Sequence, residues 1–142
     1  MAIAVDKAVA YMRGANPSIN PSCFYSGSTG HYQAQISLTE AWIGKKDTKV
    51  PAGCRVIGEV VENFAKANPE HIRDWSTVSK VFAESVSGKV YVLLGEMINP
   101  DSIWLKYERD ALKKNGKVIE VEVWKVEADG KLKKTNKTKE TM

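Results

Sequence analysis

The first half of the chain has the apolar spacing of helices. Residues 3–13 carry apolar side chains at helical spacing, and Asn16-Pro17 ends that segment. Helices are also expected over residues 55–67 and from about residue 70 to Val86. The start signal of the last one is Asn68-Pro69-Glu70, with Asn as the cap and Pro at the first helical position.

Strand patterns dominate the second half. Residues 89–95 form a nearly continuous apolar run, which is typical of a strand covered on both faces. Residues 103–108 are strand-like, and residues 118–126 alternate apolar and polar side chains as a half-exposed strand does. The order of elements predicts an α/β fold, in which a helical N-terminal half packs on a small, mainly parallel C-terminal sheet.

A Gly/Ser loop follows a short expected strand in the first half of the chain. The apolar run of residues 23–25 leads into the loop of residues 26–30, and a helix is expected from about Gly30 to Trp42. Such a loop at a helix N-terminus can offer free backbone N–H groups to an anion. Loops of this kind more often only turn the chain, and the pattern leaves both interpretations open.

The composition is that of one globular domain. The chain has 142 residues, of which 43% are hydrophobic and 27% charged. It lacks a run of about 18 apolar residues, so no membrane span is expected. The N-terminal segment, with Asp6 and Lys7, is not typical of a secretory signal.

The net charge of +4 comes from the C-terminus. Residues 131–142 hold five lysines and one acid, whereas the rest of the chain has equal numbers of basic and acidic residues. We therefore expect a single domain over residues 1–130 and a basic, mobile tail over residues 131–142. Nucleic acid is not an expected partner, because that role favours basic residues spread over a face or groove.

The chain has two cysteines, Cys23 and Cys54, and two histidines, His31 and His71. Their spacing matches no metal-binding motif, so no metal site is expected. Two cysteines are too few for a disulfide scaffold, and we expect both to be small, buried, hydrophobic side chains. Their redox state stays open, and a Cys–His nucleophile would need residues brought together from distant segments.

The helix expected over residues 70–86 carries one face formed by Trp75, Ser79, Phe82 and Val86. In one interpretation the whole face is core, and the Ser79 hydroxyl bonds to a carbonyl one turn earlier. In the other interpretation the first turn opens onto a cleft. Trp75 then offers a ring to a flat cationic ligand, and Ser79 offers a hydroxyl.

Glu108 is the second candidate. It ends the strand-like segment and follows Trp104 and Tyr107. Functional groups in α/β folds gather beyond the carboxyl ends of strands, which makes this carboxylate a candidate site residue. Simple surface pairing with Lys106 or Arg109 is the alternative.

These residues belong to a stretch with a family resemblance. The segment Trp75-Ser-Thr-Val-Ser79-Lys-Val-Phe-Ala83-Glu-Ser, followed by residues 88–95, resembles a central block of the ADP-ribosyl cyclase / NAD glycohydrolase family. Phe24-Tyr25-Ser26-Gly27 resembles the family's upstream aromatic-Trp-Ser motif, with Tyr25 in place of Trp. Residues 37–44 resemble its Thr-Leu-Glu-Asp-x-Leu-x-Gly segment. Ser102 and Glu108 stand where the family has a Thr-Phe pair and its catalytic Glu.

The resemblance implies an ADP-ribosyl cyclase-like fold and cleavage of the nicotinamide–ribose bond of NAD+. The Glu108 carboxylate would stabilise an oxocarbenium-like state, with NAD+ as the substrate and with no metal or bound cofactor. Trp75 would stack on the nicotinamide, Tyr25 would form the opposite wall, and serine hydroxyls would bind phosphate or ribose oxygens. The substrate-binding residues implied are Tyr25, Ser26, Gly27, Thr39, Glu40, Trp75, Ser79 and Ser102.

The chain departs from the family at two of these positions. Thr39 stands where an acidic residue influences cyclisation against hydrolysis, although Glu40 is its neighbour. Gly27 stands where some members have a phosphate-binding Arg, so phosphate binding would depend on the backbone and on Ser26. The product therefore stays open between ADP-ribose and cyclic ADP-ribose.

Animal members of the family are longer and rich in disulfides. The short form is similar to the delivered C-terminal toxin or effector domain of a secreted bacterial protein, which would act in a target cytoplasm and have an inhibitor or immunity protein as a partner. Two alternatives remain. One is a non-catalytic nucleotide-binding module, a sponge for an NAD-derived signal, and the other is a small nuclease-type toxin that uses the basic tail.

Overall fold

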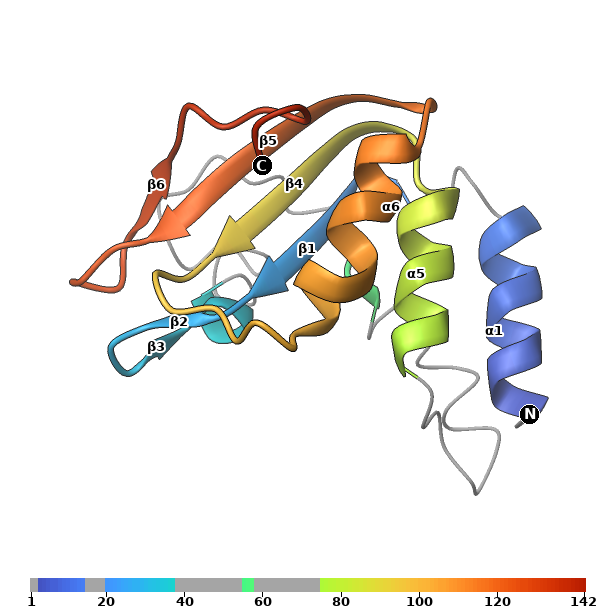
Figure 1. The fold of residues 1–142 in the computed structure, drawn as a ribbon, viewed down its shortest axis with the longest axis horizontal. Helices are drawn as coiled ribbons and strands as arrows, with labels where there is room; N and C mark the ends of the chain where they lie inside the picture. The colour runs from blue at the N-terminus through green and yellow to red at the C-terminus, as the bar shows by residue number, and fades with distance from the viewer. Residues whose placement is uncertain (1–2, 15–19, 38–54, 58–74) are drawn as a thin grey trace.

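The computed structural model describes residues 3–14, 20–37, 55–57 and 75–142. Its main sheet has the strand order β1-β4-β5-β6. The strands are β1 (Ser22–Ser26), β4 (Gly88–Leu94), β5 (Val118–Val126) and β6 (Leu132–Lys134). β1, β4 and β5 are parallel to one another, whereas β6 runs antiparallel to β5. The helices α1 (Ile3–Gly14), α5 (Trp75–Ser85) and α6 (Arg109–Lys114) stand side by side next to this sheet (Figure 1).

This arrangement confirms the α/β class for the described residues. The sheet is mainly parallel, as expected, but its edge strand β1 comes from the N-terminal half of the chain. The helix expected over residues 55–67, apart from residues 55–57, lies outside the described residues.

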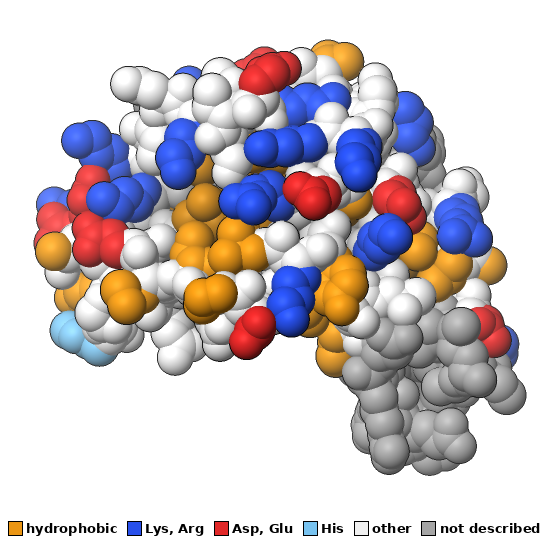
Figure 2. All heavy atoms as spheres, viewed as in Figure 1, with side chains coloured by type: hydrophobic (Ala, Val, Ile, Leu, Met, Phe, Trp, Pro, Cys, Tyr) orange, Lys and Arg blue, Asp and Glu red, His pale blue; other side chains and the backbone are white. Residues whose placement is uncertain are grey.

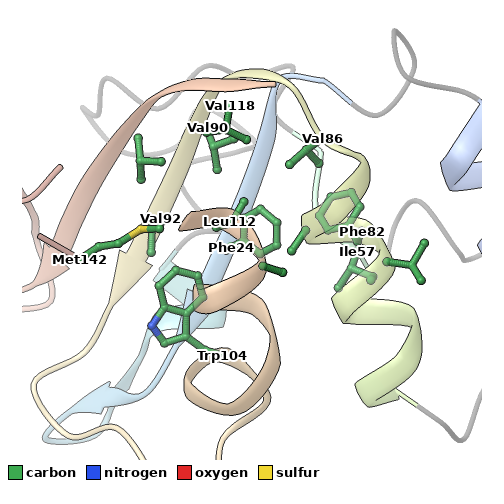
Figure 3. Close-up of a cluster of buried hydrophobic side chains, with 14 of the residues drawn as sticks. Phe24, Ile57, Phe82, Val86, Val90, Val92, Trp104, Leu112, Val118 and Met142 are labelled. Carbon is green, nitrogen blue, oxygen red and sulfur yellow. The ribbon is translucent and has the colours of Figure 1, made fainter. Parts of the chain in front are cut away.

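The apolar run at residues 89–95 forms the central strand β4, which is buried on both faces. Val90, Val92 and Leu94 belong to the core cluster that includes the helices. Tyr91 and Leu93 belong to a second cluster with Trp124. Figure 3 shows the first cluster, where Phe24, Phe82 and Trp104 meet. The ring centroid of Phe24 lies 5.1 Å from that of Phe82 and 6.1 Å from that of Trp104.

The expected helix from Gly30 is wrong in its first turn. Residues 28–33 form a hairpin of β2 (Ser28–Thr29) and β3 (Tyr32–Gln33), and residues 34–37 are helical. Gly30 has a φ of +58°, a conformation that suits glycine in a tight turn. The Thr29 hydroxyl joins the hairpin to the sheet, because it donates to the Val126 carbonyl at 2.6 Å and accepts from the Glu96 N–H at 3.0 Å.

The expected strand at residues 103–108 is also wrong. Residues Trp104–Glu108 form a π-helix, η2, that continues into α6, and the Arg109 N–H bonds to the Trp104 carbonyl. The Asn99-Pro-Asp-Ser turn starts this helix, because the Ser102 hydroxyl accepts a hydrogen bond from the Leu105 N–H at 3.3 Å. Tertiary contacts override the strand propensity of Ile103 and Trp104.

β5 differs from the half-exposed strand that its alternation predicts. It lies between β4 and β6, and Glu122 and Trp124 are only 8% and 5% exposed. The Trp124 indole N–H donates to the Glu122 carboxylate at 3.1 Å. Alternation alone could not show that the strand is covered on both faces from Val121 onward, whereas Ile119 is 81% exposed.

The expected mobile tail is part of the fold. Leu132–Lys134 forms β6, and Thr135 donates to the Val123 carbonyl through its backbone N–H at 2.9 Å and its hydroxyl at 2.8 Å. Met142 is buried in the helix-side core, beside Val92 (Figure 3). Residues 131–142 therefore belong to the same packed unit as β5.

The expectation of a buried hydrophobic Cys23 needs one correction. Cys23 is 1% exposed, and it is disulfide-bonded. Its backbone N–H donates to the Arg55 carbonyl at 2.8 Å, next to the edge of β1. Cys54, the other cysteine of the chain, lies outside the described residues.

Candidate functional site

A cavity of about 450 Å³ lies at the carboxyl end of β1, beside the first turn of α5 and the inner side of η2. Ligands of open parallel sheets bind beyond the carboxyl ends of the strands, so this position is typical of a functional site. The cavity brings together candidates from three distant segments. Its walls include Tyr25, Ser26, Trp75, Ser79 and Glu108.

Glu108 forms the only charged part of the wall among the described lining residues. Its side chain is 6% exposed, and no hydrogen bond or ion pair from another described residue reaches it. Burial raises the pKa of the Glu108 carboxyl from 4.5 to about 8. At this pKa the acid is mostly neutral at pH 7, and a cation nearby would favour its ionised form.

The apolar face of α5 is core in its second half and borders the cavity in its first turn and a half. Phe82 and Val86 are fully buried in the core, while Trp75 and Ser79 line the cavity. Trp75 is the first residue of α5 and is 36% exposed, so its ring stands at the mouth. Ser79 is 3% exposed and lies one helical turn deeper.

β1 supplies the facing wall through Tyr25 and Ser26, its last two residues. Both side chains are partly buried. The pKa of the Tyr25 hydroxyl is raised by burial and, to a smaller extent, by the Glu108 carboxylate. The phenol and the carboxylate are therefore close enough to interact.

Gly27 and Ser102 do not line the cavity. Gly27 has a φ of +82°, and a Cβ there would collide with the Met97 carbonyl oxygen, so a phosphate-binding Arg has no room at this position. The Ser28 N–H, next in the loop, donates to the same Met97 oxygen at 2.9 Å. Because this loop N–H is bonded to a carbonyl, it is not free to bind an anion. The hydrogen bond therefore favours the interpretation in which the Gly/Ser loop turns the chain.

Ser102 lies at the start of η2, where its hydroxyl accepts the Leu105 N–H. The structure therefore gives Ser102 a local role in starting the helix. Thr39 and Glu40, the remaining candidates, lie outside the described residues.

Trp104 and Gln35 line the cavity, and the sequence patterns did not single them out as site residues. Trp104 is 2% exposed and forms part of the floor, whereas Gln35 is exposed at the rim. Trp104 and Glu108 are spaced four residues apart, which would have placed them on one face if residues 103–108 had been interpreted as a helix. Gln35 follows a hairpin that the sequence did not predict.

In the described ranges, no cluster of histidine, cysteine or carboxylate side chains is arranged to hold a metal ion. None of the helices described is both long enough and apolar enough to cross a membrane. Comparisons of the chain with protein-family models, with curated proteins and with solved structures find no match.

Proposed function

We propose that the protein is an NAD+ glycohydrolase with an ADP-ribosyl cyclase-like fold. The observation that carries the proposal is the meeting of Tyr25, Trp75 and Glu108, with Ser26 and Ser79, around one cavity. These residues come from segments up to 83 positions apart, and the family resemblance names all five. If the apolar face of α5 were only core and Glu108 only a surface carboxylate, these residues would have no need to line the same cavity.

The cavity suits the chemistry of a nicotinamide–ribose bond. The bond between C1′ and the pyridinium nitrogen breaks, and its electron pair moves to that nitrogen, so nicotinamide leaves as a neutral molecule. No general acid is needed, unlike in ordinary glycosidases with two carboxylates. The ionised Glu108 stabilises the positive charge that develops on the ribose. Water then attacks C1′ and loses a proton, which gives ADP-ribose. Attack by the adenine of the same molecule gives the cyclic product.

Each wall has a role in this mechanism. Trp75 stacks on the pyridinium at the cavity mouth, and a desolvated cation–π contact of this kind contributes about 2 kcal/mol. Tyr25 forms the opposite wall, and the Ser26 and Ser79 hydroxyls bind ribose or phosphate oxygens. The pyridinium charge also lowers the pKa of the Glu108 carboxyl, so substrate binding itself produces the ionised form.

A direct test is to incubate the purified protein with NAD+ and to separate nicotinamide, ADP-ribose and cyclic ADP-ribose by chromatography. We expect nicotinamide release, and we expect Glu108→Gln to lower kcat by about a hundredfold or more, since the amide keeps the shape but lacks the charge. Glu122→Gln is the matched control, because Glu122 is a similarly buried glutamate that lies away from the cavity. Wild-type rates in Glu108→Gln would refute the catalytic assignment.

A nucleotide-binding module without turnover is the second candidate. It is favoured by the raised pKa of Glu108, because a neutral carboxyl can donate a hydrogen bond without stabilising a cation. The same incubation separates the two functions: NAD+ binding without nicotinamide release favours the module. If nicotinamide is released, NAD+ depletion in a target cell, with an inhibitor protein for protection, would be the effect of a delivered toxin domain.

A further inference from the structure

A second, larger hollow lies on the other side of η2. It is a groove of about 770 Å³ between α5, α6 and the loop that follows α6. We propose that this groove, called the lysine groove here, is a docking surface for an acidic protein partner. Its charged residues are Lys80, Lys106, Lys114, Lys117, Glu84 and Asp110. It shares no lining residue with the cavity at Glu108.

The charges of the lysine groove are mostly free of partners within the described part of the chain. Lys106 pairs with Asp101 at 3.2 Å. Lys80, Lys114, Glu84 and Asp110 make no ion pair with a described residue. The unpaired lysines and carboxylates of the lysine groove can pair with opposite charges on a protein surface. Such charge complementarity speeds association and selects partners.

Two buried hydrogen bonds hold the floor of the lysine groove together. The Asn115 side chain is buried and donates to the carbonyls of Ala83 at 2.9 Å and Val86 at 2.8 Å. These two hydrogen bonds fix the end of α6 against the end of α5. A surface that is ordered before binding loses little conformational entropy in a complex.

The C-terminal segment enlarges the positive surface next to the lysine groove. The Lys139 ammonium donates to the carbonyls of Asn115 at 2.8 Å and Val118 at 3.0 Å, so this segment lies against the loop that follows α6. Figure 2 shows Lys and Arg side chains spread over the viewed face, with Asp and Glu side chains among them. Of the basic residues that the sequence placed in a separate tail, Lys139 thus lies next to the end of α6.

The residues of the lysine groove favour an acidic protein over nucleic acid. Glu84 and Asp110 lie among its lysines and would repel a continuous phosphate backbone, whereas a protein can present both signs. Its described lining contains no arginine, the side chain with the fork geometry that suits phosphate. Tyr107 adds a ring that is 38% exposed, and tyrosine is enriched in protein interfaces.

The binding test uses two labelled probes of equal net charge, with the full chain in fluorescence anisotropy titrations. One is an acidic peptide of about 20 residues with a few lysines spaced among its glutamates, and the other is a single-stranded DNA. We expect the peptide to bind more tightly than the DNA, with an affinity that falls as salt is raised. The double variant Lys80→Glu/Lys114→Glu should weaken peptide binding by about tenfold or more. Both side chains are exposed, so this variant should fold.

The matched control is Lys131→Glu/Lys133→Glu, which makes the same charge change at two exposed lysines at the β6 edge of the sheet. It should weaken the peptide by less than about threefold. The proposal is overturned if neither probe binds, if DNA binds more tightly, or if both double variants weaken the peptide equally. None of these outcomes depends on whether the protein cleaves NAD+.

Discussion

Ionisation of Glu108 should control the pH dependence of NAD+ cleavage. With a pKa of about 8, only about a tenth of the Glu108 carboxyl is ionised at pH 7 and about nine-tenths at pH 9. The value of kcat/KM reports groups of the free enzyme. It should therefore rise about tenfold between pH 7 and pH 9. Tyr25 does not interfere, because its pKa is raised further above its ordinary value of 10.0.

The bound substrate should shift this profile. A pyridinium charge about 5 Å from the carboxylate, at an effective dielectric constant of about 20, favours the ionised form by about 3 kcal/mol. This energy corresponds to a pKa about two units lower, near pH 6. Since kcat reports the enzyme–substrate complex, it should reach its plateau about two pH units below kcat/KM.

The assay is the initial rate of nicotinamide release from pH 5.5 to 9.5, with protein-free blanks subtracted at each pH. Glu108→Gln should retain only a low, pH-independent rate, because its amide does not titrate in this range. Profiles that coincide for kcat and kcat/KM would show that substrate charge does not reach the carboxyl. Rates that fall as pH rises would mean that a protonated Glu108 acts as an acid, and they would refute the reasoning.

The remaining predictions concern stability and the aromatic walls. Because folding raises the pKa of Glu108, the folded chain keeps a proton that the unfolded chain loses between pH 4.5 and about 8. The stability contributed by this group is present below pH 4.5 and falls by about 1.4 kcal/mol per pH unit through this window, on the order of 5 kcal/mol in all. Urea unfolding at pH 5 and pH 8 should thus show Glu108→Gln gaining stability relative to the wild type, and an unchanged difference would contradict the burial argument. Trp124→Ala should cost about 3–5 kcal/mol in unfolding experiments, because it removes a ring that is only 5% exposed. Trp75→Ala should mainly lower kcat/KM, and a Trp75→Ala protein that is folded and fully active would remove the case for stacking.

The sequence predicted those elements whose burial follows from the spacing of their own apolar residues. Within the run at residues 89–95, residues 90–94 are all apolar, so both faces of the strand carry apolar side chains, and residues 90–94 of β4 are buried. The helical spacing of Trp75 and Ser79 with Phe82 predicted one face of α5. It could not show where the core ends and the cavity begins, because that boundary is set by η2 and β1, which are distant in sequence.

Other elements depend on hydrogen bonds that the hydrophobic pattern does not reveal. The polar residues after Lys131 resemble a solvated end, yet they are held by the carbonyls of Val123, Asn115 and Val118. Trp104 has the side chain of a strand residue, but the turn at Asn99 and the bond from Ser102 direct the chain into a helix. In both cases hydrogen bonds between side chains and the backbone decide between structures that the apolar pattern leaves open.

A comparison of two buried glutamates shows why the environment of Glu108 points to function. Burial acts to raise the pKa of Glu122 as well, but hydrogen bonds from Lys134 and Trp124 and the nearby Lys89 lower it overall. Glu122 is thus a satisfied structural carboxylate at 8% exposure. Glu108 is 6% exposed, burial alone is the cause of its raised pKa, and it has no such partner among the described residues. A buried carboxyl without a partner destabilises the fold, and glutamine or leucine would remove that cost. Its presence in the wall of an open cavity is explained most directly if a cationic ligand supplies the missing charge.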